Sequence, residues 1–307
     1  MLIKAKAEKP KAKKRLSSDK GQNVAYLYLL PWILGFLIFQ LYPFLSSFIY
    51  AFTDFSILKS MKFVGLQNII RLFTIDDIFK KSLLVTLKYV LIAVPLKLIF
   101  ALIIAMIANM KLKFINFFRT IYYLPSILGG SVAIAILWRT IFSRDGAINR
   151  LLPIPPVDWL GDRKIALFTL GLLVIWQFGS SMVLFLAGLK NIPAELYESA
   201  KIDGANPILV FFKITFPMLS PIVFFNLIMQ TILAFQEYTS PAFITGGGPI
   251  KETYLYTMML YDNGFKYMKM GYASAQTWVL FIIILIFTVI VFKTSIYWTF
   301  YQDGGDF

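Results

Sequence analysis

The sequence contains no cysteine and no histidine among its 307 residues, and only 15% of the residues are charged. The missing cysteines exclude disulfides and thiolate nucleophiles, and the absence of both residue types excludes Cys/His zinc sites and imidazole acid–base catalysis. Hydrophobic residues make up 58% of the chain, whereas a soluble domain typically has about 25% charged residues and less apolar character. The composition therefore indicates a membrane protein.

Basic residues are concentrated at the start of the chain. Residues 1–20 hold eight Lys or Arg against Glu8 and Asp19, within a formal net charge of +14 for the whole chain. A polar tail of this composition, taken here as residues 1–23, is typical of a disordered segment beside a membrane. The apolar stretch that follows is longer than that of a signal peptide and ends in no small-x-small pattern, so we expect an uncleaved first helix.

Six apolar segments are long enough to span a bilayer, which takes about 20 largely uncharged residues in a helix. They are residues 24–53, 83–109, 120–138, 165–189, 214–236 and 270–292. Only the second segment contains charged side chains, those of Lys88 and Lys97. The sequence therefore predicts an all-α integral membrane protein with six transmembrane helices over residues 24–300 and a short C-terminal tail at 301–307.

The basic tail also favours one orientation. Six spans place both termini on the same side, and Lys and Arg close to the first span favour the cytoplasmic side. The other polar segments are about equally basic on both sides, so this inference depends on the tail. We expect both termini to be cytoplasmic.

The segment 190–213 between the fourth and fifth predicted spans has signals for two short helices. Pro193 suits a first helical turn, and Glu195 and Glu198 would lie near the positive N-terminal end of a helix that ends near Lys201. Asp203-Gly204 supplies a break, and Asn206-Pro207 is a signal for a new helix start. We expect a protruding hairpin over residues 193–213. A hairpin that only anchors the two flanking spans is the alternative.

The residues of this hairpin carry a family resemblance. Residues 195–205 read ELYESAKIDGA, and residues 212–217 read FKITFP. The spacing of Glu198, Ala200 and Asp203-Gly204 resembles the EAA loop in permease subunits of binding-protein-dependent ABC importers, with Ser199 where the family usually has Ala. Similarity to the sugar-importing branch, which includes the maltose and glycerol-phosphate permeases, extends over most of residues 24–300. Its further matching segments are 118–125, 137–149, 245–249 and 271–275.

The resemblance implies a type I ABC importer permease-like fold and a set of partners. These are a second homologous permease, two ATPase subunits that dock on the hairpin, an extracytoplasmic solute-binding protein, and a sugar or oligosaccharide substrate in the bilayer of a bacterial inner membrane. No nucleic-acid partner is expected. The ATPase-coupling residues would be Glu195, Tyr197, Glu198, Ala200, Asp203 and Gly204. Glu195, Tyr197 and Glu198 would form the exposed side, and Gly204 would adopt a positive φ where the chain turns.

The chain is not expected to hydrolyse ATP or to hold a metal. No Gly-x-x-x-x-Gly-Lys-Ser/Thr sequence occurs, so ATP and Mg would be used by the partner ATPase subunits, and this chain would bind no cofactor. The glycine run at 245–249 is followed by no Gly-Lys-Ser/Thr, and we interpret it as a turn in a surface loop.

Polar residues at membrane depth are candidates for a sugar pathway, because amides and hydroxyls bind sugar hydroxyls and aromatic faces contact pyranose rings. The candidates are Lys97, Ser131, Trp176, Gln177, Ser180, Asn226, Gln230 and Glu237. Asn226, Gln230 and Glu237 are offset by four and seven, so they would share a helix face. The alternative is that these side chains join helices to one another.

Lys97 stands out because a charge near the middle of a span is costly unless it is paired or faces water. One interpretation is a counter-ion for an anionic substrate such as a uronate oligosaccharide or a sugar phosphate. The alternative is that Lys97 snorkels, or that it donates to carbonyls freed near Pro95 or in a partner permease.

Two other function classes compete with the importer. An intramembrane enzyme would need paired acids or a Ser–Lys dyad at membrane depth. A secondary transporter or channel is compatible with the helix count, but carriers driven by protons or sodium usually hold intramembrane acids, and no Asp or Glu lies within the six predicted spans.

Overall fold

The structure is a computed structural model that describes residues 18–57, 60–110 and 112–300. Within these residues the regular elements are helices, and one isolated bridge pairs Thr53 with Phe63. The predicted basic tail (1–23) lies mostly, and the C-terminal tail (301–307) entirely, outside the described residues. The described chain therefore has the all-α character that the composition predicts.

The chain forms two compact units, Met1–Ile49 and Tyr50–Phe307. The described part of the first unit consists of α1 (Ser18–Phe36), a π-helical turn η1 (Leu37–Leu41) and most of α2 (Tyr42–Ala51). Residues Tyr26–Ala51 are long and apolar enough to cross a membrane. They agree with the first predicted span.

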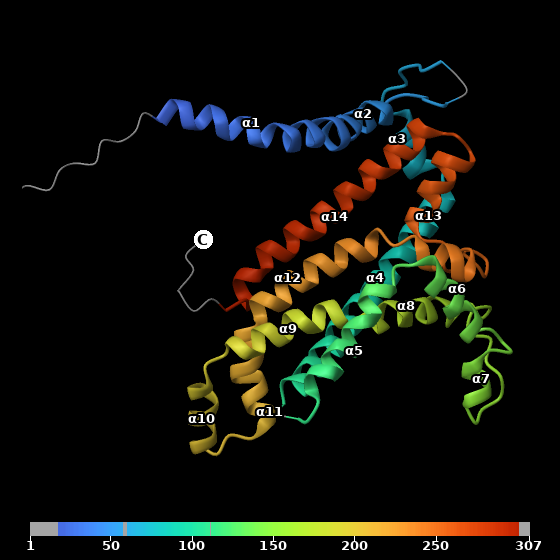
Figure 1. The fold of residues 1–307 in the computed structure, drawn as a ribbon. Helices are drawn as coiled ribbons and strands as arrows, with labels where there is room; N and C mark the ends of the chain where they lie inside the picture. The colour runs from blue at the N-terminus through green and yellow to red at the C-terminus, as the bar shows by residue number, and fades with distance from the viewer. Residues whose placement is uncertain (1–17, 58–59, 111, 301–307) are drawn as a thin grey trace, which may run out of the picture. The chain divides into compact units, whose positions relative to one another are not determined.

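The second unit is built around one long helix, α4 (Asp77–Asn109), which packs against α8, α9 and α12 (Figure 1). Ala93, Ala101, Ala105 and Ala108 of α4 are each 0% exposed. Such small residues let neighbouring helix backbones approach closely, which is how helices associate when the surrounding solvent is itself apolar. The other long helices are α12 (Phe216–Phe235) and α14 (Met270–Trp298).

Two of the predicted spans are bent and not straight. The third consists of α5 (Ile115–Leu128) and α6 (Val132–Ile141), which meet at 102°, and the fourth consists of α8 (Ala166–Trp176) and α9 (Gly179–Asn191), which meet at 49°. The described residues thus contain four single helices able to span a membrane, or up to six spans if each bent pair is one. The sequence placed these two spans at 120–138 and 165–189 without predicting their bends, because a charge-free run measures length but not direction.

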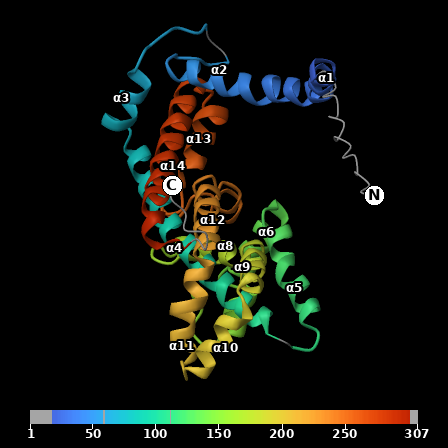
Figure 2. The ribbon, with the colours of Figure 1, turned by 90° about the vertical axis from the view of Figure 1, so that its left-hand side faces the viewer.

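Shorter elements complete the second unit. They are α3 (Gln67–Thr74), α7 (Ala147–Leu151), α10 (Ala194–Ile202), α11 (Pro207–Val210), α13 (Tyr256–Tyr261) and the π-helical turns η2 (Phe211–Thr215), η3 (Pro241–Thr245) and η4 (Asp262–Lys266). Helices α10 and α11 project beyond α9 and α12 at one end of this unit, and α3 and α13 lie at the opposite end (Figures 1 and 2). The predicted hairpin is therefore confirmed as a projecting structure.

Candidate functional site

A polar pocket of about 320 Å³ lies where α4, the α8–α9 break and the end of α12 meet. Its walls combine aliphatic side chains with four amide or charged groups that the sequence singled out. The lining residues are Val94, Lys97, Val174, Gln177, Gln230, Leu233, Ala234, Gln236, Glu237, Tyr238 and Thr239. The structure therefore brings Lys97, Gln177, Gln230 and Glu237 together from three separate parts of the chain.

Lys97 is the buried cation of this pocket. Only 6% of the residue is exposed, and Nζ donates a hydrogen bond to Gln230 Oε1 at 2.8 Å. Among the described residues its hydrogen-bond partner is thus a neutral side-chain amide and not a carbonyl near Pro95. The snorkelling interpretation is wrong, because Lys97 is packed inside the helix bundle. An ammonium group has three donors, so the pocket retains hydrogen-bonding capacity at a positive charge.

Glu237 reaches the same pocket from beyond the end of a helix. Helix α12 ends at Phe235, so Glu237 does not lie on one helix face with Asn226 and Gln230, and that part of the spacing argument was wrong. The carboxylate Oε1 accepts a hydrogen bond from Ser240 N at 2.8 Å, and the main-chain oxygen accepts one from the Thr257 hydroxyl. These contacts fix Glu237 at the pocket's edge.

Gln177 stands at the break in the fourth span. It follows the last residue of α8 and donates from Nε2 to the carbonyl oxygen of Gly129 at 3.0 Å. Because Gln177 also lines the pocket, one amide side chain connects the pocket with the break in the third span.

Four other candidates lie outside the pocket lining. Ser131 caps α6, where its hydroxyl accepts from Ile134 N at 3.3 Å. Trp176 is half-buried with its ring 6.0 Å from that of Trp138. Asn226 is fully buried and donates to the Ile222 carbonyl, while its Oδ1 has no hydrogen-bond partner among the described residues. The fourth is Ser180, which is half-buried in α9.

Three polar residues of the pocket were not among the sequence candidates: Gln236, Tyr238 and Thr239. They flank Glu237, so a continuous polar run after the fifth span was the available signal. Because that run lies beyond the helix end, its placement depends on the turn into η3.

The hairpin has the local structure that its sequence indicates. Gly204 has φ +70° between α10 and α11, a backbone conformation that glycine adopts without a steric cost. Asn206 caps α11, because its Oδ1 accepts from Leu209 N at 2.8 Å. Glu195, Glu198 and Asp203 are exposed and Ala200 is buried. The hairpin therefore presents three carboxylates to solvent.

Tyr197 differs from the expected exposed side chain. It is half-buried, and its hydroxyl lies 3.1 Å from Thr215 Oγ1 in the π-helical turn η2. The phenol ring packs against the core because α10 folds back toward the start of α12. Tyr197 thus joins the hairpin to the fifth span.

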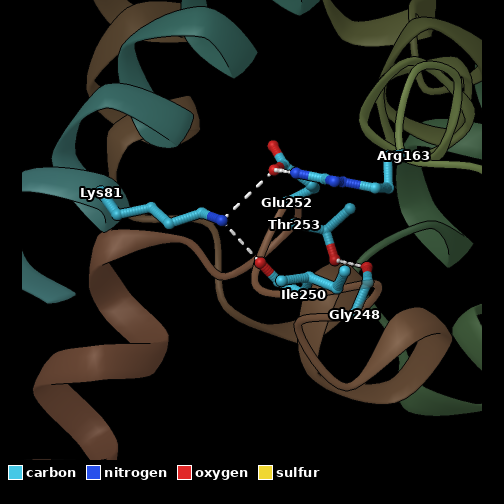
Figure 3. Close-up of polar contacts among 6 residues, drawn as sticks. All are labelled: Lys81, Arg163, Gly248, Ile250, Glu252 and Thr253. Carbon is cyan, nitrogen blue, oxygen red and sulfur yellow. Dashed lines mark hydrogen bonds and ion pairs between the residues drawn. The ribbon is translucent and has the colours of Figure 1, made fainter.

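Lys81, Arg163 and Glu252 form an ionic cluster (Figure 3). Glu252 Oε1 is 3.1 Å from Arg163 Nη2 and 3.2 Å from Lys81 Nζ, which also donates to the Ile250 carbonyl at 2.6 Å. The Arg163 hydrogen bond, together with Lys81, holds the pKa of Glu252 below its usual value. Three separated segments are tied together here, and the glycine run beside them is a turn with Gly246 at φ +60° and Gly247 at φ +85°.

Comparison with known proteins places this chain in a family. Residues 79–299 match the family described as binding-protein-dependent transport system inner membrane component. The chain belongs to this family. The predicted family resemblance is therefore confirmed, and the permease is a membrane subunit of this kind of transport system.

Named relatives are similar over nearly the whole permease. The probable ABC transporter permease protein YesP of Bacillus subtilis (strain 168) is 49% identical over 298 residues, which cover 95% of this chain and 96% of YesP. The arabinooligosaccharides transport system permease protein AraP of the same organism is 35% identical and covers 88% of each chain. These relatives are ABC transporter permeases.

A solved structure supports the fold. The permease has a TM-score of 0.79 to a chain in the crystal structure of a bacterial alginate ABC transporter in complex with alginate pentasaccharide-bound periplasmic protein. The match covers 92% of this chain and 97% of that chain at 22% identity. At this identity the likeness establishes the importer-permease fold.

Proposed function

We propose that the permease pairs with a second homologous permease to form the pathway of an ATP-driven sugar or oligosaccharide importer. The observation that carries this proposal is the 193–213 hairpin, which projects from the ends of α9 and α12 with Glu195, Glu198 and Asp203 exposed. A soluble subunit that moves the hairpin would move two spans at once. Two partner ATPase subunits would supply that motion, with ATP and Mg bound on them.

The substrate class is supported by the pocket and by the relatives. AraP is named for arabinooligosaccharides, and the similar solved structure is an alginate transporter with a pentasaccharide-bound periplasmic protein. The pocket offers three side-chain amides, a hydroxyl, a phenol and a cation, which are groups that bind sugar hydroxyls. An extracytoplasmic solute-binding protein would deliver the sugar at the end of the unit opposite the hairpin, and both termini would be cytoplasmic.

Lys97 favours an anionic sugar over a neutral one. Its ammonium donates to the neutral amide of Gln230, and the Glu237 carboxylate of the same pocket forms no direct ion pair with it. A bound carboxylate or phosphate would therefore add a direct anionic contact to Lys97. A buried charge is stabilised strongly by such a partner and is costly without one. Glu237 at the pocket's edge would accept from sugar hydroxyls.

A secondary transporter is the competing function. It would need an ion-coupling group at membrane depth, and the described spans contain no Asp or Glu away from their ends. A tagged permease purified from its native membrane should retain the ATPase subunits. In proteoliposomes the complex, supplied with its solute-binding protein, should accumulate trigalacturonate only with ATP on the hairpin side. Uptake that needs no ATP but collapses with the proton gradient would contradict the importer.

A further inference from the structure

The breaks in the third and fourth spans lie against each other. The first separates α5 from α6 at residues 129–131, and the second separates α8 from α9 at residues 177–178. A helix break leaves backbone groups without partners in their own helix, and water is absent at membrane depth to satisfy them. The hydrogen bonds that replace them therefore decide how each break is held.

Ser126 of α5 satisfies the break in the fourth span. Its hydroxyl donates to the Gln177 carbonyl oxygen at 3.0 Å and accepts from Ser180 N at 2.9 Å. Phe178, the residue before α9, offers no side-chain cap. One serine on another helix thus does the work of both a C-terminal and an N-terminal cap.

Gln177 satisfies the break in the third span in return. Its Nε2 donates to the carbonyl oxygen of Gly129, the residue after the end of α5, at 3.0 Å. The two breaks therefore exchange caps, and neither can change its geometry without removing a hydrogen bond from the other.

Two glycines allow this close contact. A Cβ on Gly179 would lie 2.5 Å from the Tyr122 carbonyl oxygen and 2.9 Å from Ser126 Oγ, and a Cβ on Gly129 would overlap the Gln177 side chain. Contacts that short are sterically excluded, so both positions require glycine while the breaks stay paired.

We propose that Ser126 and Gln177 are positioning residues that join the two breaks into one mechanical unit, here called the paired joint. Gln177 also lines the pocket. A sugar that turns the Gln177 amide toward the pocket withdraws Nε2 from the Gly129 carbonyl oxygen, so occupancy of the pocket loosens the paired joint. This second step rests on the proposed function, whereas the joint itself does not. A ligand shifts such an equilibrium only through a contact that differs between the two states.

Hydrogen exchange on the complete importer in nanodiscs tests the joint without any sugar. Ser126→Ala should speed exchange about two- to tenfold, the range for loss of one hydrogen bond, in residues 177–182 and also in residues 127–134. Ser126→Thr keeps the hydroxyl and should restore protection in both segments. Thr120→Val is the matched control, because among the described residues the Thr120 hydroxyl on α5 bonds to the Asn116 carbonyl of its own helix alone.

The effect of Ser126→Ala on exchange in 127–134 distinguishes the paired joint from a purely local packing role of Ser126 at 177–182. Ser126→Ala that speeds exchange only in 177–182, with 127–134 unchanged, would overturn the paired joint. Gln177→Met should speed exchange in 127–134. In the Ser126→Ala/Gln177→Met double variant the change in exchange free energy should be smaller than the sum of the changes in the two single variants, because the caps act together. Full additivity would overturn the proposal as well.

The pocket arm uses trigalacturonate as the probe. In the wild-type importer it should speed exchange in 127–134 while slowing exchange in the pocket segment 230–239. Protection of 230–239 without a change in 127–134 would overturn the link between pocket and joint. If neither segment changes, the proposed substrate site is contradicted, and the sugar-free variants alone then decide whether the joint exists.

Discussion

Replacement of Lys97 by methionine gives the sharpest test of what the pocket selects. The change keeps the length of the side chain and removes the charge that now donates to Gln230 Oε1 at 2.8 Å. We expect uptake of trigalacturonate to fall far more than uptake of the same trimer after reduction of its carboxyl groups. The two probes share length and linkage, so the difference between them reports charge recognition.

The size of the effect follows from the burial of the ammonium. Lys97 is 6% exposed, and a hydrogen bond to a charged group contributes about 1.5–3 kcal/mol. Each 1.4 kcal/mol is a factor of ten in affinity, so the anionic trimer should lose about 10- to 100-fold in its apparent affinity. The loss of the Gln230 partner leaves a buried carbonyl unpaired, but that cost is common to both probes.

The assay is ATP-dependent uptake into proteoliposomes over a range of probe concentrations. Lys88→Met is the matched control, because Lys88 lies on the same helix with an exposed side chain and outside the pocket lining. Lys88→Met should leave the ratio of the two probes unchanged. Equal losses of both trimers in Lys97→Met, or a wild-type preference for the reduced trimer, would refute charge selection by Lys97.

Three further predictions concern the hairpin and the ionic cluster. Gly204→Val should insert correctly but lose substrate-stimulated ATPase activity, because φ +70° costs a side chain with a Cβ about 1–2 kcal/mol. Tyr197→Phe should lower the same stimulation about two- to tenfold by removing the contact with Thr215 Oγ1, measured on the purified complex. In Glu252→Gln the melting temperature should fall less steeply than in wild type as the pH is lowered. Because the pKa of Glu252 is lower in the folded protein than the usual 4.5, the carboxylate stabilises the fold above pH 4.5. This stabilisation is lost as the pH falls below 4.5 and through the folded-state pKa.

Each of these has an outcome that contradicts it. Gly204→Asn should retain stimulation because asparagine tolerates a positive φ, and equal loss in both Gly204 variants would exclude a conformational cause. Thr215→Val should match Tyr197→Phe and add nothing to it. If the melting temperature falls identically in wild type and Glu252→Gln as the pH is lowered from 7 to well below 4.5, the Glu252 carboxylate does not contribute to the acid sensitivity of the fold.

Local signals predicted the hairpin well. Asp203-Gly204 and Asn206-Pro207 act through their own backbone preferences, which is why both ends of α10 and the start of α11 lie within a residue or so of the expected positions. The C-terminal end of α12 and the start of α14 likewise lie within a residue of the predicted positions, whereas α14 continues past Lys293 to Trp298. Features that depend on neighbouring residues in the sequence could therefore be inferred from it.

Features set by tertiary contacts could not. The bend at 177–178 is held by Ser126, which lies more than fifty residues away in the chain, and no periodicity reports such a partner. Gly129-Gly130-Ser131 did offer a local sign of a kink, since Gly and Ser pairs commonly interrupt helices. The burial of Tyr197 depends in the same way on how α10 folds back onto η2. Charge and length alone therefore predicted the number of spans but not their paths.

The two helices that flank the hairpin lead to two walls of one pocket. The first flanking helix is α9, which runs from Asn191 back to the break beside Gln177. The other runs from Pro207 without interruption to Phe235, a single helical span that carries Gln230 near its far end. A helix transmits displacement along its axis because its backbone hydrogen bonds resist compression, so a shift of the hairpin moves Gln177 and Gln230 relative to Lys97 on α4. With the paired joint beside Gln177 on one wall and the continuous helix 207–235 on the other, one motion of the hairpin would change the shape of the pocket.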